Sequence, residues 1–62
     1  MRKLSSLDKK FLVVLAFGNN ERRYYVEAPN KAAAEAKAQL EWFEEFPDDY
    51  PRTILKEERE RW

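Results

Sequence analysis

The side chains that could do chemistry in this 62-residue chain are carboxylates and cations, because the sequence contains no cysteine and no histidine. Adjacent carboxylates occur at Glu44-Glu45 and Asp48-Asp49. A carboxylate pair works as general acid and base only where burial or a close like charge raises one pKa, and nothing in the sequence around these pairs predicts burial. The single glycine also excludes a glycine-rich phosphate loop. We therefore predict a protein that is not an enzyme and that has no cofactor and no metal site.

A basic and aromatic run, Arg22-Arg23-Tyr24-Tyr25, is the one pattern that points toward nucleic acid, since bases stack on aromatic side chains beside phosphate-binding cations. The whole chain opposes this interpretation. Its twelve basic residues balance twelve acidic ones, so the electrostatic attraction to a polyanion is missing. A small nucleic-acid-binding protein is therefore the weaker alternative.

The charges of the segment 31–46 are more informative, because they oppose the dipole of the helix that we predict there. Lys31 stands at the expected positive end, and Glu41, Glu44 and Glu45 stand near the negative end. Such a cluster does not stabilise the helix, which suggests an acidic patch that docks on a basic partner surface. The matching candidate cations for protein binding follow further along the chain: Arg52, Lys56 and Arg59.

Two strands joined by a tight turn must position these side chains. Residues 10–17 and 21–28 are rich in Val, Tyr and Phe, and they flank Gly18-Asn19-Asn20. Two hairpin registers are open: a Gly18-Asn19 turn places Val13 opposite Tyr24, and an Asn19-Asn20 turn places Leu15 there. Both registers give one core face, with these residues: Phe11, Val13, Leu15, Tyr24 and Val26.

A helix is predicted over residues 31–46, with Asn30 as its N-cap and Pro47 at its end. At 100° per residue one stripe is expected to face the sheet. Its residues are Ala32, Ala33, Ala36, Leu40, Phe43 and Phe46. Trp42 lies at the border of this stripe and is expected to be half-buried.

The segment 52–56 is predicted to be a third strand, although a helix starting after Asp49 is an alternative. A strand is favoured because a hairpin and one helix alone make a narrow sheet. The expected fold is an α+β domain of order ββαβ over residues 10–58, with a three-stranded antiparallel sheet, strand one central and one helix on one face. Residues 1–9 and 59–62 are expected to be tails.

The first strand is apolar on both faces, which is typical of a central strand. Its second face joins a tyrosine of the next strand to form an apolar surface that the predicted helix does not cover: Leu12, Val14, Ala16 and Tyr25. The N-terminal tail, a second copy of the chain or another protein are the candidates to cover it, and a homodimer follows from the second of these.

The apolar run FLVVLAF is too short for a membrane helix, and the three charges Asp8, Lys9 and Lys10 before it do not suit a secretory signal. We therefore expect no membrane association. The absence of cysteine fits a reducing cytoplasm, so a cytoplasmic protein is predicted.

The order of these motifs resembles the small phage-encoded inhibitors of bacterial RNA polymerase found in T-seven-like podophages. The resemblance covers about residues 9–58. It consists of Lys9-Lys10-Phe11, the strand end 25–28, the Asn30 cap, the alanine-rich helix, Leu40-Glu41-Trp42 and the strand residues 53–56.

The resemblance implies a ββαβ protein that binds the jaw of the polymerase β′ subunit in the host cytoplasm and blocks transcription initiation. Lys56 matches a basic residue of the third strand, and Glu41 matches a helix carboxylate before the tryptophan. The sequence departs from the family pattern at Ile54, where another basic residue is expected, and in its longer loop after the helix.

Overall fold

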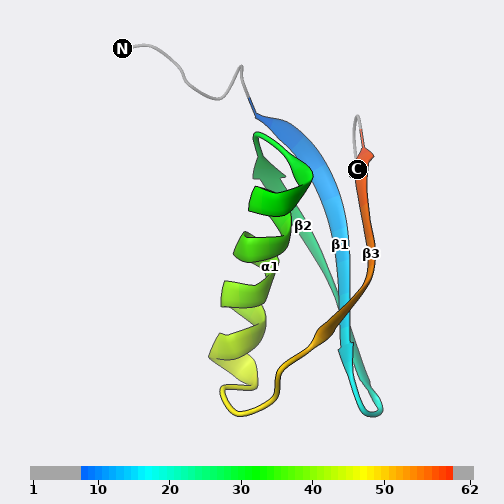
Figure 1. Ribbon diagram of the computed structural model, residues 1–62, viewed down its shortest axis with the longest axis vertical. Coiled ribbons are helices and arrows are strands. Elements are labelled where there is room, and N and C mark those ends of the chain that lie inside the picture. The colour runs from blue at the N-terminus through cyan, green and yellow to red at the C-terminus, as the bar shows by residue number, and fades with distance from the viewer. Residues whose placement is uncertain (1–7, 60–62) are drawn as a thin grey trace.

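Three strands and one helix make up residues 8–59, the part of the chain that the computed structural model describes. They follow one another as β1 (Lys9–Phe17), β2 (Asn20–Ala28), α1 (Lys31–Glu45) and β3 (Arg52–Arg59). The sheet is antiparallel with the order β2-β1-β3, and α1 covers one of its faces (Figure 1). This confirms the predicted ββαβ architecture with strand one in the centre.

The sheet is slightly longer than predicted at the end where β1 begins and β3 ends. Lys9 begins β1 and Arg59 ends β3, so each takes a residue that was assigned to a tail. The prediction that residues after Lys56 leave the sheet was wrong, because Glu57, Glu58 and Arg59 pair with β1. The rest of the predicted tails, residues 1–7 and 60–62, lies outside the described residues.

The hairpin turn is Gly18-Asn19, since Phe17 pairs with Asn20 and Val13 with Tyr24. Gly18 has a φ of 62°, and no other described residue has a positive φ. A positive φ at the first central residue alone is the pattern of a type II′ turn, whose twist suits a two-residue hairpin. Glycine at this position therefore selects one of the two registers that the sequence left open.

A side chain caps the start of helix α1, and a backbone hydrogen bond caps its end. The Asn30 side chain accepts a hydrogen bond from the Ala33 N–H at 2.8 Å, as predicted for an N-cap. At the other end the Phe46 N–H donates to the Trp42 carbonyl at 2.8 Å. No helix within residues 8–59 is long and apolar enough to span a membrane.

The rotation of α1 about its axis differs from the prediction. Its buried residues are Ala34, Ala38 and Trp42, whereas Ala32 and Ala36 are exposed. Leu40, which was expected in the core, is 69% exposed. The i, i+4 spacing brings two alanines close to the sheet and then fills the widening gap with an indole, which buries more apolar area than a leucine does.

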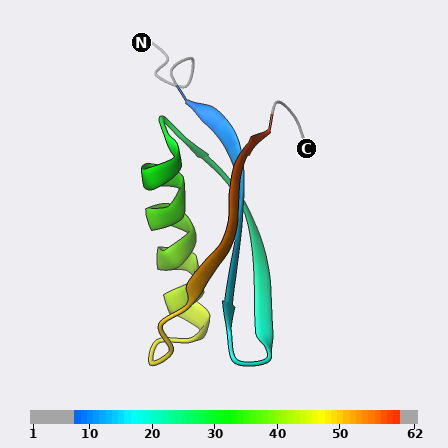
Figure 2. The same ribbon diagram turned by 45° about the vertical axis from the view of Figure 1, so that its right-hand side comes forward.

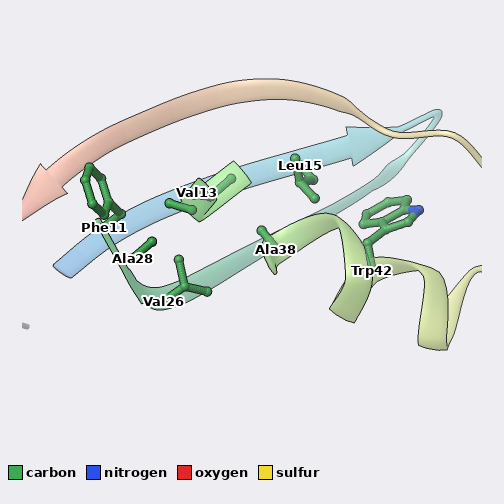
Figure 3. Close-up of a cluster of buried hydrophobic side chains, with 8 residues drawn as sticks. Phe11, Val13, Leu15, Val26, Ala28, Ala38 and Trp42 are labelled. Atoms are coloured by element: carbon green, nitrogen blue, oxygen red, sulfur yellow. The ribbon is translucent and has the colours of Figure 1, made fainter. Parts of the chain in front are cut away.

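The core lies between α1 and the sheet face that carries Phe11, Val13 and Leu15 (Figure 3). Trp42 is fully buried and its indole N–H donates to the Asp49 carbonyl at 2.9 Å, so the loop after the helix is held against the core. The Trp42 ring also packs on Phe46, with ring centroids 4.5 Å apart. The prediction of a half-buried Trp42 was therefore wrong.

A β-bulge interrupts the pairing of β3 with β1. Val14 pairs with Leu55 and Leu15 pairs with Thr53, which leaves Ile54 as the extra residue. Lys56 and Thr53 lie on the helix side of the sheet, because they pair with the core residues Val13 and Leu15. β3 pairs with β1 from Lys10 to Ala16 and overlaps it in the view of Figure 2, where the β1–β2 hairpin extends beyond the start of β3.

Candidate protein-binding site

The predicted acidic residues lie on the flank of α1 that faces the outer edge of β2. Glu41, Glu44 and Glu45 line an open groove together with Tyr24 of β2. Glu41 also closes an adjoining groove, whose remaining residues are Tyr25, Val26, Glu27, Lys37 and Leu40. We call this continuous surface the α1–β2 groove.

Only one of the three acidic side chains forms an ion pair within residues 8–59. Arg22 binds the Glu45 carboxylate through two nitrogen–oxygen contacts of 3.4 Å, and its guanidinium carbon lies 5.2 Å from the centroid of the Phe46 ring. Glu41 and Glu44 are exposed and have no cation of the described chain within ion-pair distance. The last turn of α1 holds no basic residue either. Two negative charges therefore face solvent at the negative end of the helix dipole.

Tyr24 lines this groove. Its hydroxyl oxygen is buried and has no hydrogen-bond partner within residues 8–59. Burial, followed by the nearby Glu45 carboxylate, raises the pKa of Tyr24 above its ordinary value of 10.0. The hydroxyl therefore stays neutral at physiological pH and adds no charge to the groove.

The predicted basic residue Lys56 lies on the opposite flank of α1. Its ammonium group binds the Glu35 carboxylate at 2.9 Å, and the Thr53 hydroxyl donates a hydrogen bond to the same carboxylate. The Thr53 hydrogen bond, followed by that of Lys56, lowers the pKa of Glu35 below its ordinary value of 4.5. Lys56 thus holds β3 to the helix.

Glu35 is the residue that sequence reasoning missed. It stands apart from the acidic cluster, as the one acidic residue in the first ten positions of the helix. That isolation was the available signal, because a lone carboxylate on a helix flank fits a specific partner better than a patch. The sequence did not identify Thr53 and Lys56 as its partners, because this pairing depends on the rotation of α1 about its axis.

Arg52 and Arg59 lie on the face of the sheet that α1 leaves open. Arg52 pairs with Ala16 and Arg59 with Lys10, so the two cations stand at opposite ends of β3. At about 3.3 Å per residue they are roughly 20 Å apart. Arg59 also binds the Glu57 carboxylate at 2.5 Å.

The structure therefore does not bring the six predicted charged residues onto one surface. The three carboxylates line the α1–β2 groove, Lys56 lies on the other flank, and the two arginines lie on the open face of the sheet. A partner in contact with all six would have to surround the molecule.

The basic and aromatic run of β2 is divided in the same way. Tyr24 pairs with Val13 and faces α1, whereas Arg23 and Tyr25 pair with residues of the open face. A stacking platform made of all four consecutive side chains is therefore not formed.

The open face of the sheet, which we call the back face, consists of the alternate residues of all three strands. They are Lys10, Leu12, Val14, Ala16, Glu21, Arg23, Tyr25, Glu27, Arg52, Ile54, Leu55, Glu57 and Arg59. The predicted residues Leu12, Val14 and Ala16 form its centre, but each is at most 7% exposed because neighbouring side chains flank them. Tyr25 is exposed, as are Ile54 and Leu55 of the bulge, which were not predicted to belong to this face.

Within residues 8–59, no group of acidic side chains is arranged to hold a metal ion. Comparison with known proteins found no matching family model, no matching curated protein and no matching solved structure.

Proposed function

We propose that this protein acts by binding another protein and that the α1–β2 groove is the contact surface. One observation carries the proposal: Glu41 and Glu44 lie exposed at the carbonyl end of α1 with no intramolecular cation within ion-pair distance among the described residues. Each such charge costs the helix about 0.3–1 kcal/mol. A partner that supplies cations offsets this cost when it binds.

The chemistry of the groove indicates the kind of partner. Leu40 is 69% exposed between the carboxylates and the β2 edge, so the surface offers an apolar side chain beside the acidic groups Glu27 and Glu41 and the cation Lys37. A complementary surface presents Lys or Arg side chains around a small apolar depression. Charges at the rim of such a contact speed association, and the buried apolar side chain supplies affinity.

The first partner to test is the β′ subunit of bacterial RNA polymerase, which the resemblance to the phage inhibitors suggests. On this proposal the chain is a phage protein that blocks transcription initiation in the host cytoplasm. Glu41 is the matching helix carboxylate and lies in the groove, whereas the matching cation Lys56 is bound to Glu35. We therefore assign the contact to the acidic flank.

The test is a pull-down from bacterial lysate with the immobilised protein, repeated with purified polymerase and a promoter-dependent transcription assay. The informative variant is Glu41→Lys with Glu44→Lys. These substitutions suit the helix dipole, and circular dichroism checks that the double variant is folded, so that loss of binding is not attributed to unfolding. We expect the double variant to lose β′ and to lose inhibition.

The matched control is Glu58→Lys, which makes the same charge change at an exposed position of β3 outside the groove. It should bind like the wild type. Failure of the wild-type protein to recover β′ would exclude the polymerase as partner. Equal recovery by wild type and double variant would exclude the groove as the contact. Lys56→Glu is a poor probe because it breaks the contact with Glu35.

A further inference from the structure

We propose that the back face of the sheet is a self-association surface, on which a second copy of this chain packs with the two-fold axis parallel to the strands. This goes beyond the proposed function, because the back face lies on the opposite side of the sheet from α1 (Figure 2). Apolar side chains lie in the middle of this face and charged side chains lie at its two ends.

The apolar side chains lie in the middle of the back face. Val14 is the centre, with Leu55 and Ile54 of β3 on one side. Tyr25 is 55% exposed, Ile54 52% and Leu55 37%, so they rise above the buried centre and remain in contact with water. The bulge contributes to this patch, since it turns two consecutive side chains of β3 to the same face. An apolar centre with a charged rim is the usual composition of a protein interface.

The charges of the rim follow a regular rule. At one end of the face, Ala16 has Glu21 beside it on β2 and Arg52 beside it on β3. At the other end, Lys10 has Glu27 on β2 and Arg59 on β3. Each end therefore carries an acid on the β2 side and an arginine on the β3 side.

A two-fold axis parallel to the strands makes this pattern of acids and arginines self-complementary, and it places Lys10 of the two copies opposite each other on the central strands. The rotation keeps the strand direction and exchanges the two sides, so β2 of one copy lies over β3 of the other. Glu21 then faces Arg52 of the second copy, and Glu27 faces Arg59 of the second copy. By symmetry the interface holds each of these pairs twice.

The charges also select this packing against others. An axis across the strands would place Glu21 against Glu27 of the second copy, which brings like charges together. A polyanion is a poor occupant, because three carboxylates are distributed among the four cations of the face: Lys10, Arg23, Arg52 and Arg59. Sheets that pack face to face cross at about 30°, and this displaces the ends by distances that Arg and Glu side chains can span.

The size of the face sets the strength that we expect. Three strands spaced about 4.8 Å apart and eight residues long give a face of roughly 14 by 26 Å. The two facing footprints together cover roughly 730 Å², which is below the about 1,200 Å² of standard specific interfaces and in the range of weak, transient contacts. We therefore expect a weak, reversible dimer that forms at high micromolar to millimolar concentration.

Glu21 and Arg52 are the sharpest probes of the interface, because neither forms an ion pair within residues 8–59. Arg59 is bound to Glu57 within the chain and would have to share its guanidinium between two carboxylates. Val14→Lys is unsuitable, since Val14 is only 5% exposed and a buried charge there would unfold the protein.

The experiment measures the dimer by analytical ultracentrifugation and native mass spectrometry over a concentration series. Glu21→Arg alone and Arg52→Glu alone each place two like-charge pairs in the homodimer, and we expect about a tenfold weaker association for each. An equal mixture of the two variants places only opposite charges in contact in its heterodimer. The mixture should therefore associate as strongly as the wild type, and masses should show the mixed species.

The matched control is Glu58→Arg, a charge reversal on the helix side of β3, which should leave dimerisation unchanged. Circular dichroism checks that every variant is folded. A wild-type protein that stays monomeric at millimolar concentration overturns the proposal. So does a dimer that the two single variants do not weaken, or one that mixing them does not restore, because either result requires a different interface.

Discussion

The contact of Glu35 with Thr53 and Lys56 shows how one side chain connects the helix to an edge strand. Thr53 and Lys56 each donate a hydrogen bond to one oxygen of the Glu35 carboxylate. The Glu35 side chain is 26% exposed. Both hydrogen bonds favour the ionised form, which is why the pKa of Glu35 is lowered. The contact therefore stabilises the folded protein only while this carboxylate is charged.

Glu35→Gln tests the contact through the dependence of stability on pH. The pKa of Glu35 is lower in the folded protein than its ordinary value of 4.5. Its contribution is therefore complete above that value, and it disappears as the pH falls through the folded pKa. At neutral pH we expect the free energy of unfolding of the variant to be lower by about 1 kcal/mol. The effect is modest because Glu35 and Lys56 are partly exposed, so water weakens their attraction.

The measurement is urea unfolding of the wild type and the variant between neutral and strongly acidic pH. The difference in free energy of unfolding should shrink below pH 4.5. Glu58→Gln is the control, since Glu58 is exposed and forms no ion pair within residues 8–59. A difference that is constant with pH would show that Glu35 acts through packing rather than charge.

At this scale the sequence predicted which side chains are charged and exposed, but not which of them are paired. The carboxylates that were predicted as an acidic patch for docking, Glu41, Glu44 and Glu45, line one groove. Lys56 was assigned to a partner surface and is bound to Glu35 instead. Pairing depends on distances between elements, and residue type alone does not contain them.

The helix α1 shows which properties of an element are local. Its N-cap, its length and its stop before Pro47 were predicted, because each depends on neighbours in the chain. The prediction of which helix face is buried was wrong, because five alanines within seven residues make a weak apolar stripe. The buried face was decided by the fit of Trp42 against the sheet, which is a tertiary property.

Asn30→Ala tests the cap. The variant leaves the Ala33 N–H without its acceptor, and we expect the free energy of unfolding to fall by about 1 kcal/mol. Asn30→Asp keeps an acceptor oxygen and should restore stability, with a small gain from the helix dipole. Urea unfolding followed by circular dichroism measures both, and equal stability of all three proteins would contradict the role of the cap.

The strand β3 shows what a bulge does to a pattern. Ile54 and Leu55 are adjacent apolar residues that fit neither the period of a strand nor that of a helix, which left both structures open. In the structure the two residues occupy one face because pairing with β1 skips one position. The sequence of β3 alone does not indicate this bulge, because the bulge depends on the pairing with β1.

At the scale of the whole molecule, one helix covers one face of a three-stranded sheet, and no element within residues 8–59 covers the other face. The stability of so short a chain is marginal, at roughly 3–9 kcal/mol if it follows the usual value per residue. A contact that stabilises the folded state by about 1–2 kcal/mol is therefore a large fraction of the free energy of unfolding.

The proposed dimer predicts that stability depends on protein concentration. The midpoint of thermal unfolding of the wild type should rise with concentration, because association binds only the folded chain. Glu21→Arg should show a flatter dependence, and Glu41→Lys should follow the wild type, since its side chain lies in the α1–β2 groove. Scanning calorimetry over a hundredfold concentration range measures this, and identical slopes for all three would contradict the back-face dimer.

Lys37 affects whether further strands can add to the β2 edge of the sheet, which is one route to aggregation. Its ammonium group binds the Glu27 carbonyl at 2.5 Å, on the outer edge of β2. A sheet grows into a fibre only if both of its edges accept new strands. A strand that adds at the β2 edge would have to displace Lys37 from this carbonyl, so Lys37 disfavours growth of the sheet at this edge.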